Sequence, residues 1–264
     1  MQLNSVIGNY IPKNSFVHNM DVRIKLIVSL ALIVVIFFCR SWVSYALMAG
    51  FVVGCVAAAR LPARALLRAF RPLYFILGFT LVFNVFFLRQ GDLIWGWRFI
   101  QLTTGGLMQG LTMAARLLIL VALTSVLTLT TSPIELTDGL EKLMRPLTWV
   151  RFPAHELAMM MSIALRFIPT LTEEANRIIR AQQARGADFE SGNIFARAKA
   201  LLPVLIPLLL SAFRRAEDLA MAMESRCYRG GKGRTRMKIL RMSWRDGVAA
   251  AGMVAVTAGV FLLR

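Results

Sequence analysis

HELAMMMSIALRFIPTLTEEANRIIRAQQARG, residues 155–186, is the stretch that decides the fold of this chain. Apolar residues recur in it every three or four positions, which places an apolar stripe along one side of a helix. The other side is charged, and Glu173 and Arg177 stand four residues apart in the order that favours pairing. A continuous helix over residues 155–185 would be about 46 Å long, at about 1.5 Å per residue. We therefore predict a long amphipathic helix.

A second long helix is predicted over about Leu201 to Arg226, and its character changes along its length. Residues 201–213, LLPVLIPLLLSAF, are almost wholly apolar, but they are fewer than the roughly 20 residues that an independent membrane span needs. The residues that follow are charged on one side only. Such a helix is typical of a membrane interface. A buried hairpin of a soluble domain is the alternative, and the apolar segments on either side disfavour it.

The composition places the chain among polytopic membrane proteins. Hydrophobic residues make up 57% of its 264 residues and charged residues only 17%. A net charge of +17 would suggest nucleic acid as the partner of a soluble protein, but here the basic residues belong to cytoplasmic loops, so we expect a lipid membrane and no nucleic acid. The three cysteines and two histidines have no metal-ligand spacing, so we expect no metal site and no cofactor.

Five apolar segments predict five transmembrane helices. Arginines cluster between the second and third segments, at 60, 64, 68 and 71, which places that loop and the N-terminus inside the cell. Trp95 and Trp97 suit the headgroup level of an outer loop. The expected spans are residues 26–39, 43–59, 72–88, 111–129 and 247–263.

These spans divide the chain into four parts of an all-α, multi-pass membrane protein. We expect an N-terminal cytoplasmic arm (1–25), a four-span region (26–130), a cytoplasmic coupling domain of long crossed helices (131–242) and a C-terminal transmembrane helix (243–264). The third part opens with a helix start, in which Ser132 is the N-cap, Pro133 the first helical residue and Glu135 the third residue after the cap. Arg116, inside the fourth span, is either a snorkelling side chain or a buried functional charge.

No motif for catalysis is present in the sequence. Gly231 and Lys232 resemble the end of a P-loop, but Arg226 stands where that motif needs its first glycine and Gly233 where it needs Ser or Thr. The chain also lacks GxSxG, HExxH and a carboxylate pair inside a span. We expect no catalytic residue. A self-contained channel or carrier is the alternative function, and a membrane-embedded enzyme a more distant one.

Each long helix ends in a similar short basic sequence, AQQARGADF (181–189) and AMESRCYRG (222–230). Gly186 suits a left-handed cap that stops the first helix just after Arg185. Arg185 is then exposed at a helix end, where it either complements the helix dipole or offers a planar fork to a carboxylate of a partner.

With these two sequences, the DVRIK start before the first span and SPIELTDGLEKLMRPL after the fourth, the chain resembles the T component of energy-coupling factor (ECF) transporters over nearly its whole length. In that family two long cytoplasmic helices cross, and each ends in an Ala-Arg-Gly signature that docks in an ATPase subunit. The first signature falls on Ala184, Arg185 and Gly186. The second falls on Ser225, Arg226 and Cys227 and keeps only the arginine. Cysteine adopts a left-handed cap less cheaply than glycine, so we expect that Gly230 supplies the stop instead.

The resemblance implies a non-enzymatic coupling subunit of an ATP-driven importer of vitamins or other micronutrients in the bacterial cell membrane. Its partners would be two ABC ATPase subunits, which bind the ATP, and a membrane-embedded substrate-binding S component, either one or several interchangeable ones. We expect the S component to bind an apolar surface that includes Met159, Met160, Met161, Leu205 and Leu209, because methionines adapt to different partners. A tightly packed core is the alternative for the methionine cluster.

Overall fold

The computed structural model describes residues 10–87, 93–97, 100–150, 152–189, 193–230 and 242–263. The chain divides into two units. The bundle unit consists of Asn9–Gly139 and Leu240–Arg264, and the crossed-helix unit of Met1–Gly8 and Leu140–Ile239. Each is described below by itself.

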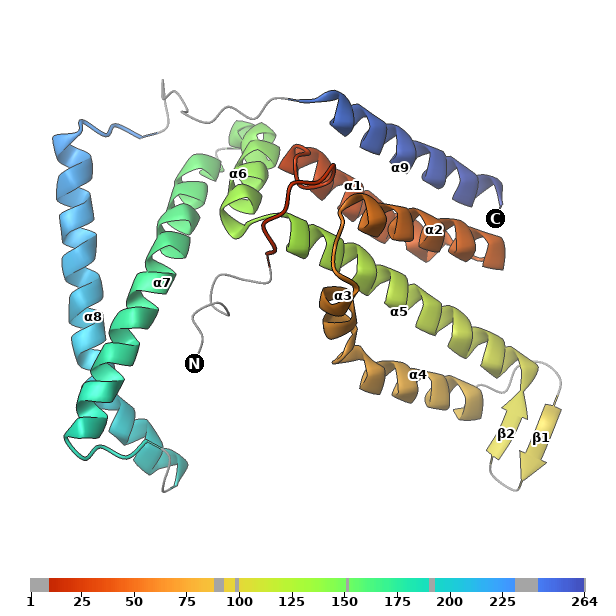
Figure 1. Cartoon of the computed structure of the whole chain (residues 1–264), viewed down its shortest axis with the longest axis horizontal. Helices are drawn as coiled ribbons and strands as arrows, with labels where there is room; N and C mark the ends of the chain where they lie inside the picture. The colour runs from red at the N-terminus through yellow and green to blue at the C-terminus, as the bar shows by residue number, and fades with distance from the viewer. Residues whose placement is uncertain are drawn as a thin grey trace. The chain divides into compact units, whose positions relative to one another are not determined.

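The bundle unit is built on helix α5 (Figure 1). Helix α5 packs against α1, α2, α3 and α4, and α9 closes the bundle by packing against α1 and α2. The elements of this unit are α1 (Val22–Val35), the 3-10 turn η2 (Ile36–Phe38), α2 (Trp42–Ala58), α3 (Ala63–Phe70), α4 (Leu73–Phe87), β1 (Leu93–Trp97), β2 (Ile100–Thr103), α5 (Thr104–Thr130) and α9 (Trp244–Leu262).

The core of the bundle lies where α1, α2, α5 and α9 meet. Leu32, Ile36 and Met48 are almost fully buried there, and Leu123 and Val260 complete the cluster from α5 and α9. Burial of an aliphatic side chain of this size contributes roughly 1.5–3 kcal/mol when the alternative is water. The apolar periodicity of the sequence therefore has a single centre in this unit.

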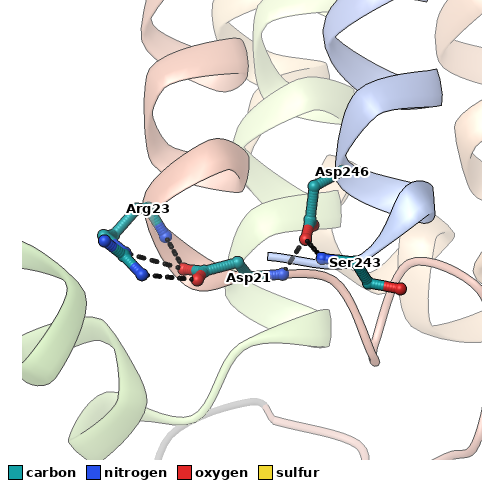
Figure 2. A network of polar contacts seen from close by, with 4 residues as sticks. All are labelled: Asp21, Arg23, Ser243 and Asp246. Atoms are coloured by element: carbon teal, nitrogen blue, oxygen red, sulfur yellow. Dashed lines mark hydrogen bonds and ion pairs between the residues drawn. The ribbon is translucent and has the colours of Figure 1, made fainter. Parts of the chain in front are cut away.

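A buried polar network joins the start of α1 to the start of α9 (Figure 2). Asp246 is 2% exposed; its Oδ1 accepts the backbone N–H of Asp21 at 2.8 Å, and its Oδ2 accepts that of Ser243 at 2.7 Å. The carboxylate of Asp21 caps α1 by accepting the Arg23 N–H, and it also holds the Arg23 guanidinium, with Nη2 to Oδ2 at 2.9 Å. Two residues 225 positions apart in sequence are thus directly bonded.

A buried lysine holds a third segment at the same end of the bundle. Lys25 is 5% exposed, and its Nζ donates to the carbonyl oxygens of His18 and Thr130, at 3.1 and 3.2 Å. Because Thr130 is the last residue of α5, this ammonium group also caps carbonyl oxygens where that helix ends.

Arg116 of α5 is directed into the bundle. Its Nη2 donates to the Tyr45 hydroxyl at 2.8 Å, and its guanidinium lies 5.6 Å from the centre of the Phe37 ring. The Tyr45 hydroxyl in turn donates to the carbonyl of Cys39. Arg116 is therefore held by an aromatic and hydrogen-bonded setting that links α5 to α2 and to the end of α1.

The segment expected as an outer loop contains a short antiparallel hairpin of β1 and β2, in which Trp95 pairs with Leu102 and Trp97 with Ile100. The loop prediction is corrected here, because LIWGW and IQLT are rich in aromatic and branched residues that favour extended backbone. The all-α prediction for the protein is otherwise confirmed, since helices form the remainder of the described structure.

Two of the described helices, α5 and α9, are long and apolar enough to cross a membrane, and a third span results if the bent pair α3 and α4 is counted as one. Helix α2 is apolar but has 17 residues. Each of the five expected spans contains a helix, at α1, α2, α4, α5 and α9. The number of spans stays a prediction.

The crossed-helix unit contains η3 (Arg145–Val150), α7 (Ala154–Ala184) and α8 (Ile194–Ser225). Helix α6 (Pro133–Met144) precedes them and starts as predicted, with the Glu135 N–H donating to the Ser132 hydroxyl at 3.3 Å. Helix α8 begins at Ile194, seven residues before the predicted start, and runs through Pro203 and Pro207. The start was placed too late because apolar periodicity begins only at Leu201, whereas IFARAKA before it contains good helix formers.

Candidate functional site

The candidate site is the pair α7 and α8, which pack against each other and cross (Figure 1). At the crossing, Glu174 of α7 accepts two hydrogen bonds from α8, from the Ser211 hydroxyl at 2.6 Å and from Arg215 Nη2 at 2.7 Å. We call these three residues the clamp. The hydrogen bond from Ser211, and then the neighbouring Arg215, lower the pKa of Glu174 below its ordinary value of 4.5. Glu174 is therefore a carboxylate at neutral pH, and the pair is an ion pair.

Helix α7 ends in a two-bond cap of backbone groups, which we call the first tip. The Gly186 N–H donates to the Gln183 carbonyl at 2.9 Å, and the Ala187 N–H donates to the Gln182 carbonyl at 3.0 Å. This pattern is the Schellman motif, and it requires a left-handed residue that Gly186 supplies with φ +88°. Arg185 is the C-cap residue and is exposed, as predicted from the sequence.

Helix α8 ends in the same motif, which we call the second tip. The Cys227 N–H donates to the Glu224 carbonyl at 2.9 Å and the Tyr228 N–H to the Met223 carbonyl at 3.0 Å, with Cys227 at φ +55°. Arg226 is the exposed C-cap residue, the counterpart of Arg185. The expectation that Gly230 would supply the stop is wrong, because Cys227 itself takes the left-handed conformation. Gly230, at φ +85°, makes a separate turn three residues later.

The clamp lies at the same distance from both tips along the chain. Arg185 follows Glu174 by 11 residues, and Arg226 follows Arg215 by 11 residues. Eleven residues span about three helical turns and roughly 16 Å, so each arginine lies on nearly the same face of its helix as its clamp residue. Neither the clamp nor this equal spacing was predicted, although the spacing is visible once Glu174 and Arg215 are known to meet.

The other residues of the two signatures are accessible. Ala184 and Ser225 are exposed, and the Ser225 hydroxyl donates to the Ala222 carbonyl of its own helix. The small side chains beside each arginine leave the guanidinium unobstructed. A guanidinium held at a rigid helix end is suited to bidentate binding of a carboxylate.

The residues expected to bind the S component fall into two places. Met160 and Met161 are each 54% exposed on α7, and Leu205 and Leu209 are 54% and 59% exposed on α8. Met159 is half-buried and lines a cavity between α7 and the end of α8. Leu205 and Leu209 belong to an exposed apolar stripe of α8 that comprises Leu201, Leu202, Leu205, Ile206, Leu209, Leu210 and Phe213.

The fold and the site together define a class of protein, an integral membrane protein of helical spans that also carries a pair of crossed, arginine-tipped helices. The family model CbiQ, described as Cobalt transport protein, matches residues 13–238. The chain belongs to this family, which comprises the transmembrane T components of energy-coupling factor transporters.

Curated relatives resemble the chain over its full length. Three of them carry the name energy-coupling factor transporter transmembrane protein EcfT. The relative from Acidaminococcus fermentans is 49% identical over 264 residues, which are 100% of this chain and 98% of the relative. Those from Listeria innocua and Bacillus subtilis are 44% and 42% identical, each over 100% of both chains. The protein is accordingly a transporter subunit in a membrane, and the transporter has further components.

Proposed function

We propose that this T component couples ATP hydrolysis to uptake of a small nutrient, by carrying motion from two ABC ATPase subunits to a substrate-binding S component. One ATPase subunit binds the first tip and the other binds the second. The observation that carries this proposal is the repetition of one motif: Arg185 and Arg226 are both exposed C-cap residues of Schellman motifs, equally far from the clamp.

The crossed pair has the properties of a mechanical element. Closure of two ATPases on each other would move the tips that they hold. The clamp joins α7 and α8 at their crossing, so movement of one tip is passed to the other helix through Glu174 and Arg215. The exposed stripe of α8 around Leu205 and Leu209, with Met160 and Met161 of α7, supplies the apolar surface for the S component.

The test of this proposal is copurification of ATPase chains, with ATP-dependent uptake, for Arg185→Ala, Arg226→Ala and the double variant. Loss of one charge-assisted contact is expected to cost on the order of 2–5 kcal/mol, mostly because the partner carboxylate is left unpaired. The double variant should assemble worse than either single one, since the second contact is intramolecular once the first has formed. Arg185→Lys should retain part of the binding, because an ammonium keeps the charge but loses the fork.

Arg180→Ala and Arg214→Ala are matched controls, since each removes an exposed arginine of the same helix away from its tip. Both should assemble and transport like the parent. If no ATPase copurified with the parent and the chain alone moved a solute, it would be a self-contained channel or carrier. Parent-like assembly and uptake by the double variant would show that the two arginines are ordinary helix-end charges.

A further inference from the structure

A cavity of about 600 Å³ lies beside the second tip, between the first half of α7 and the end of α8. Helix α7 lines it with residues at positions i, i+3, i+4 and i+7, which is one helix face. Helix α8 contributes residues at i, i+4 and i+7, and the turn after Cys227 completes the wall. The lining residues are Met159, Ser162, Ile163, Arg166, Leu219, Met223, Arg226, Cys227, Tyr228, Arg229 and Gly230.

The charges of this cavity have one sign. Arg166, Arg226 and Arg229 are exposed to solvent, and the lining residues include no carboxylate. Three guanidinium groups that converge on one space repel one another unless an anion joins them, and they offer planar forks that match carboxylates. The cavity is therefore built for a ligand that bears negative charge.

The wall between these arginines is apolar. Met159 and Ile163 of α7 face the cavity together with Leu219 and Met223 of α8, and all four are half-buried. Such a wall gives a nucleotide base or a sugar few hydrogen-bonding groups, but it suits an aliphatic or aromatic side chain. The volume lies within the roughly 300–1,000 Å³ of ordinary ligand pockets, which is room for a few side chains. A polypeptide segment that combines carboxylates with an apolar anchor matches both properties.

We propose that this cavity binds an acidic, partly apolar segment of the ATPase subunit that docks at the second tip, and that Arg166 and Arg229 hold its carboxylates together with Arg226. This inference rests on the proposed function. It adds a specific consequence: α7 grips the same ATPase that holds the end of α8, so that ATPase contacts both helices of the crossed pair. Movement of the bound segment then acts on the angle between α7 and α8 as well as on one helix end.

Arg166→Glu in the full chain tests this assignment, with capture of ATPase chains from native membranes as the measurement. Reversal of a charge that pairs with a carboxylate should weaken capture at least about tenfold. Arg229→Glu should act in the same direction, and Arg166→Lys should retain part of the capture. Lys199→Glu is the matched control, because it makes the same change of charge at an exposed position of α8 outside the cavity, and it should stay within about twofold of the parent.

A photocrosslinking residue at Ser162 gives a second measurement that does not depend on affinity. In the assembled complex it should crosslink to an ATPase chain, and the attached peptide should be rich in Asp and Glu. The same residue at Phe195, which is 89% exposed elsewhere on α8, should not give that product. Thermal melting of each variant identifies any that fails to fold.

The outcomes separate this inference from the proposed function. Parent-like capture by Arg166→Glu, with capture still lost in Arg226→Ala, would overturn the role of the cavity and leave the coupling function in place. A crosslink from Ser162 to an S component or to lipid would also overturn it. Failure of the parent to capture any ATPase would overturn both.

Discussion

Cys227 holds a backbone conformation that glycine adopts without strain, and this has a measurable cost. Its φ of +55° lies in the left-handed region, where a Cβ atom costs roughly 1–2 kcal/mol because it approaches the following carbonyl oxygen. The equivalent residue of the first tip is Gly186, which has no Cβ. The two tips therefore have the same hydrogen bonds but different intrinsic stabilities.

Cys227→Gly should stabilise the second tip by about 1 kcal/mol, since it removes this strain while both cap hydrogen bonds remain. The measurement is hydrogen exchange of the peptide that contains residues 223–230, where the amides of residues 227 and 228 should exchange several-fold more slowly. Cys227→Ala is the control, because it keeps the Cβ and should give no gain. Faster exchange in the glycine variant would show that the cysteine side chain supports the cap.

Sequence alone was a good guide to the first tip and a poor guide to the second. Gly186 directly after Arg185 is a local signal, and local signals specify helix ends. At the second tip the local preference of Cys227 pointed away from a left-handed cap, and the expected stop moved to Gly230. The hydrogen bonds to Glu224 and Met223 outweigh that preference, and a preference scale for single residues does not contain them.

Among the elements, the crossing of α7 and α8 depends on one exposed carboxylate. The folded state lowers the pKa of Glu174, so the ion pair with Arg215 stabilises the crossing at pH values above 4.5. Protonation removes this contribution as the pH falls below 4.5 and through the pKa of the folded state. The crossing should accordingly be insensitive to pH in the neutral range and become looser in acid.

The prediction concerns the distance between spin labels placed at residues 184 and 225 of a chain without its native cysteines. Glu174→Gln should broaden the distance distribution at pH 7, because the amide keeps an acceptor for Ser211 but loses the charge that pairs with Arg215. The parent should show comparable broadening only well below pH 4.5. Exchange of the pair, Glu174→Arg with Arg215→Glu, should restore a narrow distribution. A distribution that none of these changes affects would mean that apolar packing alone sets the crossing.

The elements differ in how far the sequence predicted them. Helix α6 was predicted to the residue, because Ser132, Pro133 and Glu135 are local start signals. The long helices followed from their periodicity, but periodicity gives only the face of a helix and not the point at which another helix crosses it. The clamp was missed for this reason. The hairpin of β1 and β2 was missed because its aromatic residues were assigned to a membrane-interface loop.

For the molecule as a whole, the direction of the chain through the membrane follows from its charge. The region 131–241 carries 18 Lys and Arg residues against 11 Asp and Glu, and the segment before α5 carries few basic residues. In a variant without Cys39, Cys55 and Cys227, a cysteine at Thr104 should react with an impermeant reagent from outside the cell. A cysteine at Phe195 should react only after the membrane is opened. Labelling of both positions from the same side would contradict the five-span topology.

The number of spans is where sequence and structure are hardest to match. Helix α1 has 14 residues and continues as the short turn η2, and α2 has 17 residues, so neither has the length of an ideal span of about 20. Apolar flanks such as Phe37 and Phe38 were counted with the first span from sequence, and both side chains are exposed in the structure. Hydropathy therefore located each helix, and its length alone does not decide whether that helix crosses the bilayer.

The bond between the Asp21 amide and the Asp246 carboxylate also concerns the order in which the protein is made. A ribosome that adds about 5–20 residues per second delivers Asp246 roughly 10–45 s after Asp21. During that interval the bundle has no α9, and the start of α1 lacks the carboxylate to which its amide bonds in the finished protein. A chain cut short before Ser243 would never complete the network of Figure 2. The final helix thus acts as a checkpoint of synthesis, since only a fully translated chain satisfies the buried groups where the first helix begins.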